Sequence, residues 1–264
     1  MLALIAGGGV LPTELVAELE TRPLICAMEG FPPDTLTVDL PFYLEHLGTL
    51  VAELKERGVT EICMAGSVGR PPVDPARIDA ATLPLVPIVQ KALVSGDDGA
   101  LRAMIGIFEN AGMHVRAAHE IAPHLLPPIG CLTEAQPSDT EANDAARGAG
   151  VVRAMAVADV GQACVIHKGQ ALTVEGNFGT DWMLRSMTMR PDAGGGILFK
   201  APKPGQDRRA DLPAIGPDTV TAACAAGLSG IVLEAGGVMV LGREEVMAEC
   251  ERLGLFLWVR ERTS

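Results

Sequence analysis

The sequence predicts an α/β protein with a doubly wound, mostly parallel sheet in its N-terminal half and a mixed α/β domain in its C-terminal half. Glycine is abundant, at 30 of 264 residues, while aromatic residues make up only 3%. This composition is typical of tight strand-to-helix turns and of small residues at helix–sheet contacts. Apolar strand patterns alternate with helical patterns as far as residue 118, and a hairpin pattern appears only later. That change of pattern indicates two domains.

The first half reads as strands that each lead into a turn or a helix. His46 to Arg57 has an apolar face with a helical period, and Gly58 ends it. Strands are expected at 2–6, 23–28, 60–66 and 113–118, and further helices after Leu11 and around 101–108. Strands that alternate with helices in this way form parallel sheets with right-handed crossovers.

The second half begins after a stretch rich in proline and glycine from Pro123 to Pro137, where the domain boundary is expected. Two apolar runs flank Lys168-Gly169 and predict an antiparallel hairpin. Helices are expected near 141–155, 180–189, 217–226 and 243–253, and strands at 195–200, around Gly236-Gly237 and in the closing LFLWV. The predicted domains are 1–130 and 134–264.

Charge and cysteine content narrow the classes of function. The net charge of −12 gives no general attraction for nucleic acid or for an anionic membrane. The six cysteines have no CxxC pair, and Cys26, Cys63 and Cys164 stand in apolar runs, as expected of buried thiols in a reducing cytoplasm. The apolar N-terminus lacks the basic region and cleavage site of a signal peptide. Glu234 and several glycines interrupt the most apolar window, 220–241, so no transmembrane span is expected.

The first segment that could bind a ligand is IAGGGVLP, in which a strand leads through Gly7, Gly8 and Gly9 into a helix. Free N–H groups at a helix N-terminus can bind an anion, so Gly8, Gly9, Leu11 and Pro12 are candidate contacts to a phosphate. Pro12 stands where a dinucleotide fingerprint has its third glycine, and no Lys-Ser/Thr follows as in a P-loop. A plain tight turn is the alternative interpretation.

Three further segments follow strands or begin helices. AGSVGRP ends the third strand, where open α/β sheets bind ligands, and it offers Gly66, Ser67 and Arg70. The alternative is that Arg70 stands on a solvated loop. Asp97 and Asp98 in SGDDGALR could contact a ligand or cap the next helix. His119 and Glu120 follow the fourth strand and could face a ligand or serve only the structure.

Two segments of the second half carry the strongest signals. EGNFGTD places Glu175 at a strand end and Thr180 and Asp181 at a helix start, where either of the last two could instead be the N-cap. LFKAPKPGQDRRADLPAIG, residues 198–216, gathers four cations beside Gln206 and two carboxylates; the cations are Lys200, Lys203, Arg208 and Arg209. In an acidic chain this cluster indicates a site for a polyanion and a hard metal ion. A solvated run of charges is the alternative.

Taken together, these segments resemble the UDP-2,3-diacylglucosamine pyrophosphatases of the LpxI type along essentially the whole chain. The similarity extends to DVGQACVIHKGQALTVEGNFGTD, AGLSGIVLEAGG and GLFLW, and KAPKPGQDRRADLPAIG is its most specific part. The resemblance implies a Rossmann-like N-terminal domain, a C-terminal domain of the family's own and a substrate between them. It further implies hydrolysis of UDP-2,3-diacylglucosamine to UMP and lipid X (2,3-diacylglucosamine 1-phosphate) in lipid A synthesis, by attack of water on the sugar-side phosphorus.

The resemblance also suggests a divalent cofactor such as Mg²⁺ and a critical aspartate, which is Asp211 here. Asp211 and Asp207 are the candidate metal ligands. The candidate substrate contacts, from the motifs and the resemblance together, are Gly8, Gly9, Leu11, Pro12, Gly66, Ser67, Arg70, Asp97, Asp98, His119, Glu120, Thr180, Asp181, Lys200, Lys203, Gln206 and Arg209. We expect a cytoplasmic enzyme that contacts the inner membrane peripherally and forms a homodimer. Asn177-Phe178 departs from the more polar pair that the family pattern leads us to expect, which leaves the role of both positions open.

Two other functions remain as alternatives. An NAD(P)-dependent oxidoreductase would share the N-terminal fold, but the third glycine is missing and no acidic residue clearly ends the second strand. A non-catalytic nucleotide-sugar sensor would bind the same ligand without turnover, so release of UMP separates it from an enzyme.

Overall fold

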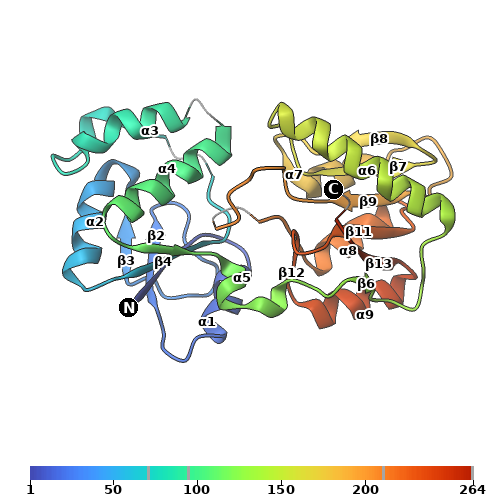
Figure 1. Ribbon diagram of the computed structural model, residues 1–264, viewed down its shortest axis with the longest axis horizontal. Coiled ribbons are helices and arrows are strands. Elements are labelled where there is room, and N and C mark those ends of the chain that lie inside the picture. Colours follow the sequence, from blue (N-terminus) through green and yellow to red (C-terminus); the bar gives the residue numbers. More distant parts are fainter. Residues whose placement is uncertain (70–71, 94–95, 210–211, 263–264) are drawn as a thin grey trace. The chain divides into compact units, whose positions relative to one another are not determined.

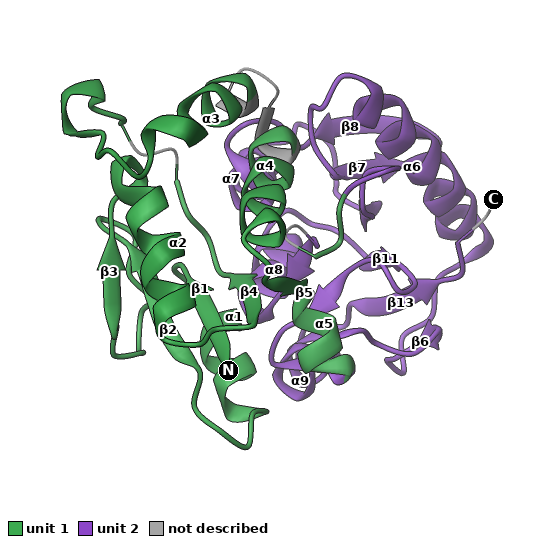
Figure 2. Ribbon diagram, turned by 60° about the vertical axis from the view of Figure 1, so that its left-hand side comes forward, with its two compact units in different colours: residues 1–123, 207–211 green, residues 124–206, 212–264 purple. Residues whose placement is uncertain are grey.

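The computed structural model describes residues 1–264 apart from 70–71, 94–95, 210–211 and 263–264, and it does not describe the side chains of 92–98. The chain divides into two compact units (Figure 2). Unit 1 contains residues 1–123 together with the short segment 207–211, and unit 2 contains 124–206 and 212–264. The segment that begins at Asp207 therefore groups with unit 1 although its flanks group with unit 2.

Residues 1–123 run from blue to green in Figure 1. Unit 1 is built on a parallel five-stranded sheet in the order β3-β2-β1-β4-β5, whose strands are labelled in Figure 2. Its elements are β1 (Leu2–Ala6), α1 (Leu11–Ala17), β2 (Leu24–Met28), β3 (Leu40–Phe42), η1 (Leu44–His46), α2 (Leu47–Glu56), β4 (Glu61–Ala65), η2 (Pro75–Arg77), η3 (Leu83–Leu85), α3 (Val86–Leu93), α4 (Gly96–Asn110), β5 (His114–Arg116) and α5 (Ala118–Ile121). The strand order reverses between β1 and β4, so the carboxyl ends of these two strands form the switch point at which such sheets bind ligands.

The apolar period of the sequence explains the core of unit 1. Leu47, Leu50 and Leu54 of α2 are buried, with Ile105 and Phe108 of α4, against one face of the sheet. Alternate strand residues point to opposite faces of a sheet, so the continuous apolar runs of β1, β2 and β4 are buried on both sides, as in other parallel sheets.

Unit 2 has a mixed six-stranded sheet in the order β6-β13-β11-β9-β7-β8. Its elements are η4 (Pro123–Leu125), which begins at the last residue of unit 1, β6 (Gly130–Cys131), α6 (Asp139–Val157), β7 (Ala163–His167), β8 (Gln170–Val174), α7 (Gly179–Met187), β9 (Ile197–Lys200), β10 (Ala214–Ile215), α8 (Pro217–Ala225), β11 (Gly230–Glu234), β12 (Met239–Val240), α9 (Arg243–Leu253) and β13 (Phe256–Arg260). β9, β11 and β13 are parallel, whereas β6, β7 and β8 pair antiparallel. β10 and β12 form a separate parallel pair.

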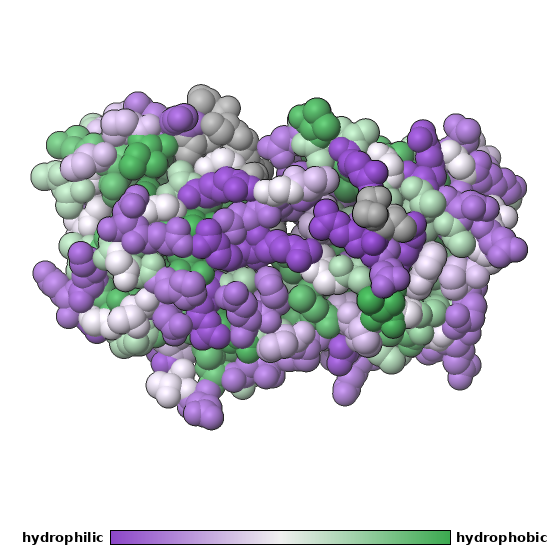
Figure 3. Space-filling model, in the orientation of Figure 1, coloured by the Kyte–Doolittle hydropathy of each residue, from purple (hydrophilic) through white to green (hydrophobic). Residues whose placement is uncertain are grey.

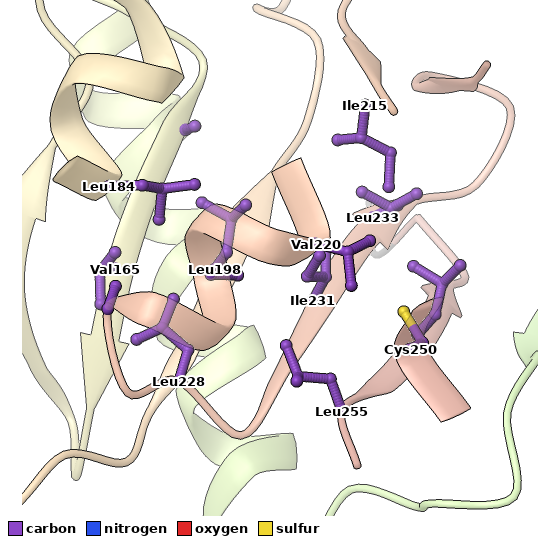
Figure 4. Packing of buried hydrophobic residues seen from close by; sticks show 14 of the residues in the cluster. Val165, Leu184, Leu198, Ile215, Val220, Leu228, Ile231, Leu233, Cys250 and Leu255 are labelled. Carbon is purple, nitrogen blue, oxygen red and sulfur yellow. The ribbon is translucent and has the colours of Figure 1, made fainter. Parts of the chain in front are cut away.

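Helices cover both faces of this sheet. Val165, Leu198 and Ile231 point toward α7, α8 and α9 and belong to the cluster drawn in Figure 4. Ile166 and Phe199 point toward α6 on the opposite face. Gly148 of α6 makes this packing possible, because a Cβ there would lie 2.6 Å from Cγ of Phe199.

The predicted fold class is confirmed, and the predicted strands and helices form with shifts of a few residues at their ends. The expected strand 113–118 is shorter, because Ala118 already begins α5. The hairpin forms as expected, with Lys168 and Gly169 both at positive φ. The three short strands β3, β6 and β10 were not predicted, and neither were α3 and α5.

Hydrophilic residues cover most of the face drawn in Figure 3, and hydrophobic residues form separate patches on it. Among the described residues, no helix combines the length and the hydropathy that a membrane span needs. All six cysteines are free thiols, and Cys26, Cys63 and Cys164 are buried as expected. Burial raises the pKa of each of these three thiols to about 12, which makes them unreactive.

Candidate functional site

The glycine turn after β1 and the turn after β4 are joined by hydrogen bonds at the switch point of unit 1. The Gly7 N–H donates to Ala65 O over 2.9 Å. Gly8 and Ser67 exchange two backbone bonds, Gly8 N to Ser67 O at 3.0 Å and Ser67 N to Gly8 O at 2.8 Å. The first two candidate motifs therefore form one structure.

Two glycines allow this close approach. A Cβ at Gly7 would lie 2.4 Å from Ser67 O, and a Cβ at Gly66 would lie 2.6 Å from Gly7 O. Gly66 also has φ of +92°, which side-chain-bearing residues rarely adopt. Both distances are shorter than any real contact of a Cβ, so the pairing of the two turns depends on the absence of side chains.

A carboxylate accepts the outward-facing N–H of the glycine turn. Gly9 N donates to Oδ2 of Asp34 over 3.0 Å, and beside it the hydroxyls of Thr13 and Thr35 are 2.7 Å apart. Gly9 and Asp34 are both exposed. The backbone N–H of Gly9 thus binds an anionic oxygen, which belongs to Asp34 in this structure, and the contact of Gly9 with a phosphate stays a prediction.

The segment 207–209 contains a guanidinium held between two carboxylates in unit 1. Arg209 donates through Nε and Nη2 to the two oxygens of Asp207, over 3.0 and 2.8 Å, and through Nη1 to Oε1 of Glu109 over 2.5 Å. The backbone N–H of Arg209 also donates to Asp207, over 3.1 Å. The hydrogen bonds that Arg209 donates hold the pKa of Asp207 below its usual value, and the acceptance of these bonds by Asp207 raises the pKa of Arg209.

His119 and Glu120 lie in α5 and differ in role. The Glu120 carboxylate accepts the Ala117 N–H over 2.9 Å, which closes the first turn of α5. His119 Nδ1 is buried and has no hydrogen-bond partner among the described residues. Burial is the main influence that lowers the pKa of His119; Glu120 acts against it and Arg208 adds to it. The lowered pKa favours the neutral form of the imidazole.

A buried polar network in unit 2 links the EGNFGTD segment to the basic loop. The Thr180 hydroxyl donates to Oε1 of Glu175 over 2.5 Å and accepts from Nζ of Lys200 over 2.8 Å. All three side chains are at most 8% exposed. Lys200 also donates to Ala214 O over 3.0 Å. The ammonium of Lys200 thus points into unit 2.

The next residues of the basic loop form a turn. Pro204 and Gly205, the latter at φ +80°, stand between Lys203 and Gln206, and Gln206 N donates to Lys203 O over 3.2 Å. Oε1 of Gln206 accepts the Lys203 N–H over 3.1 Å, and Nζ of Lys203 donates to Asp159 over 2.5 Å. The segment is therefore an ordered turn.

Several predicted site residues lie inside helices. Neither Thr180 nor Asp181 is the N-cap of α7, because that position belongs to Phe178 and both residues lie inside the helix. Asp97 and Asp98 lie in the first turn of α4, and their side chains are not described. Pro12 is buried in the first turn of α1, next to the partly buried Leu11.

Arg70 and Asp211 lie outside the described residues. Asn177 and Phe178, the pair that departs from the expected pattern, are both exposed, and Phe178 packs against Trp182 with ring centroids 5.4 Å apart.

Comparison with known proteins identifies a protein family for both halves of the chain. Residues 1–125 match the LpxI N-terminal domain and residues 128–258 match the LpxI C-terminal domain. The chain is also 36% identical over 268 aligned positions to the UDP-2,3-diacylglucosamine pyrophosphatase LpxI of Caulobacter vibrioides, covering 97% of this chain and 96% of that protein. The chain belongs to the LpxI family.

The carboxylates available for a metal ion in this LpxI-family chain can be tested against the chemistry of Mg²⁺. Among the described residues, no three His, Cys, Asp or Glu side chains form a group that could hold a metal ion. Mg²⁺ is often bound by one or two carboxylates and by phosphate oxygens of the substrate, so a hard-oxygen donor such as Asp207 fits it chemically. Oδ1 of Asp207 already accepts two hydrogen bonds, from the backbone N–H and from Nε of Arg209, whereas Oδ2 accepts one, from Nη2, so Oδ2 is the oxygen with a lone pair left for a metal ion.

Sequence reasoning missed Asp34, Glu109 and Asp159 in this LpxI-family chain. Each is a lone exposed carboxylate outside any motif, and its partner is 25, 100 or 44 residues away in the chain. Nothing in the local sequence signals such pairs. Glu175 was noted only as a strand end, although its two oxygens bind Thr180 and the Gln162 N–H.

Proposed function

We propose that this chain hydrolyses the diphosphate of UDP-2,3-diacylglucosamine and releases UMP and 2,3-diacylglucosamine 1-phosphate, lipid X, in lipid A biosynthesis. The observation that carries the proposal is the near full-length match to a protein named for this activity, with both family domains in order. The ordered basic loop and the paired glycine turns are the kinds of groups that diphosphate chemistry needs.

The reaction exchanges one phosphorus–oxygen bond for another. Water attacks the sugar-side phosphorus, the bond from that phosphorus to the bridging oxygen breaks, and the bridging oxygen leaves with the uridine-side phosphate as UMP. Hydrolysis in ¹⁸O-labelled water is therefore expected to label lipid X and not UMP. Label found in UMP would contradict this direction of attack.

The side chains of this chain neutralise charge and orient water in the proposal. Lys203 and Arg209 compensate the charge on the phosphoryl oxygens after exchanging a carboxylate partner for phosphate. Asp211 holds the metal ion or orients the attacking water. Asp211, with Asp207 as the second candidate, would hold Mg²⁺, which when bound would supply Lewis-acid stabilisation of the phosphoryl group.

The test of Asp211 is its replacement by asparagine. We expect turnover, measured as UMP release, to fall by about a thousandfold while the melting temperature stays near that of the wild type. Asp218→Asn is the matched control, because Asp218 is an exposed aspartate in the first turn of α8. Equal activity of the two variants would remove Asp211 from the mechanism.

The acyl chains of the substrate suggest where the enzyme works. We propose that the protein is cytoplasmic, contacts the inner membrane peripherally to collect its lipid substrate, and forms a homodimer as the family resemblance suggests. Sedimentation with vesicles that contain the substrate, and light scattering in solution, test these two points separately. A monomer that stays in the supernatant would contradict both.

A further inference from the structure

The loop 201–213 leaves β9 and returns at β10, and its two ends are fastened within unit 2. At the first end, Ala201 N donates to Gln162 O over 3.0 Å. At the second end, Pro213 O accepts from Met239 N over 2.8 Å, and Ala214 O accepts from Nζ of Lys200 over 3.0 Å. Lys200 is the last residue of β9, so its side chain joins the strand before the loop directly to the strand after it.

Lys200 is itself held by a chain of hydrogen bonds with a fixed direction. Its ammonium has no acceptor lone pair, so it must be the donor to Thr180, whose own proton is directed at Glu175. The other oxygen of Glu175 accepts Gln162 N–H over 2.7 Å, beside the first end of the loop. Both ends of the loop therefore depend on Glu175, one through Gln162 and the other through Thr180 and Lys200.

The contribution of this network to the stability of the fold does not by itself explain why it is there. Burying a carboxylate and an ammonium costs desolvation energy, and apolar residues of similar volume often stabilise a core equally well or better. A fully bonded polar network instead specifies one arrangement. Here the network fixes the distance between the two ends of the loop. That loop carries Lys203 and Arg209, and it also carries Asp211, three residues before Ala214.

We propose that Glu175, Thr180 and Lys200 are positioning residues that hold both ends of the loop 201–213 in place for hydrolysis. This inference rests on the proposed role of the loop in diphosphate hydrolysis. It gives Lys200 and Thr180 an indirect part in the reaction and adds Glu175, which no motif marked as functional. The bonds of Thr180 are the feature of the network that can be tested most directly, because its hydroxyl contacts both charged side chains.

The test replaces Thr180 by valine, which keeps the shape and removes the hydroxyl, and by serine, which keeps the hydroxyl. Thr133→Val is the matched control. Thr133 is also a buried threonine of unit 2, and its hydroxyl accepts from Leu257 N and donates to Ala135 O, both over 3.0 Å, with Sγ of Cys131 at 3.5 Å. Thr180→Val should lose more stability than Thr133→Val, because hydrogen bonds to charged groups contribute more than bonds to backbone groups, so activity is compared at a temperature at which both variants are folded. If folding of Thr180→Val fails, Lys200→Met removes the bond to Ala214 and leaves the Thr180–Glu175 bond in place.

We expect Thr180→Val to lower kcat by about tenfold or more with little change in KM, because small displacements of catalytic groups are costly. Thr180→Ser should restore most of the activity, and Thr133→Val should keep the wild-type kcat. Hydrogen exchange of peptides covering 201–209 should rise in Thr180→Val and stay unchanged in Thr133→Val.

Three outcomes separate the possibilities. Equal kcat and equal exchange in the loop for Thr180→Val and Thr133→Val would overturn the inference. A higher KM at unchanged kcat would also overturn it, because Thr180 would then bind substrate directly. A wild-type protein that releases no UMP would contradict the proposed function, whereas the exchange measurement would still show whether the network holds the loop.

Discussion

At the scale of single residues, the cations proposed to bind the diphosphate are already paired with carboxylates. Lys203 pairs with Asp159, and Arg209 pairs with Asp207 and Glu109. These side chains are between 16% and 42% exposed, and ion pairs of that kind contribute only about 0–1 kcal/mol. A diphosphate carries enough charge to replace such partners, so the pairing keeps the cations in place without preventing binding.

The pair of Asp207 and Arg209 makes stability depend on pH. Because Arg209 lowers the pKa of Asp207 in the folded state, the pair stabilises the protein fully above the unfolded pKa of aspartate, about 3.9. This contribution disappears as the pH falls through the lower folded pKa. Arg209→Gln should therefore cost roughly 1 kcal/mol at pH 7, and the difference from the wild type should vanish in strong acid.

Urea denaturation between pH 7 and pH 2.5 measures this difference. Arg185→Gln is the control, because Arg185 has no ion pair among the described residues. Its effect on the free energy of unfolding should stay constant through the same range. A constant difference for Arg209→Gln as well would show that the pair does not form in solution.

At the scale of elements, the two glycine turns of unit 1 support each other. Gly66→Ala should strain the backbone at φ +92° and also push the turn after β4 away from the turn after β1. Gly112 provides the matched comparison, because its φ is +88° but a Cβ there would meet nothing within 4 Å. We expect Gly112→Ala to cost about 1 kcal/mol and Gly66→Ala clearly more.

The two substitutions should also differ in activity. Gly66→Ala separates two turns proposed to bind the substrate, so KM should rise, whereas Gly112→Ala should leave KM unchanged. Thermal melts and steady-state kinetics of both variants test this. Equal losses of stability and equal KM values would show that the contact between the turns contributes neither to stability nor to substrate binding.

Some elements could be predicted from the sequence because a local signal specifies them. The helix 47–56 has an apolar face and a closing glycine, and the hairpin has Lys168-Gly169 at its turn. β3 and β6 contain only three and two residues, too few to show a period, and Pro41 is tolerated in β3 because that strand is at the sheet edge.

The residues of the candidate site also divide into those that a local sequence signal predicts and those that it does not. Gly66 and Gln206 stand in motifs with turn chemistry, so their neighbourhoods were predictable. The bond from Thr180 to Glu175 and the pairing of Arg209 with Glu109 arise only when distant segments meet. A single sequence has no local signal for pairs of residues that are far apart in the chain. The positioning network could therefore be seen only in the structure.

At the scale of the whole molecule, the chain has a separate core in each unit. Leu54 in α2 and Leu184 in α7 are both fully buried, the first among residues of unit 1 and the second among residues of unit 2. A core that is contained in one unit can open without the other, so local unfolding should follow the units. The segment 207–211 is the exception, because it groups with unit 1 and lies in the sequence between parts of unit 2.

Leu54→Ala and Leu184→Ala test this division. Each should cost about 2–5 kcal/mol in its own unit, the usual range for a buried leucine. Hydrogen exchange should then rise in β1, β2 and β4 for Leu54→Ala, and in β7, β9 and β11 for Leu184→Ala. The described part of the segment, 207–209, should follow Leu54→Ala, because its bonds run to Glu109 of α4. If exchange rises equally in both sheets for either variant, the molecule unfolds as one cooperative body and the separate cores do not act as separate units.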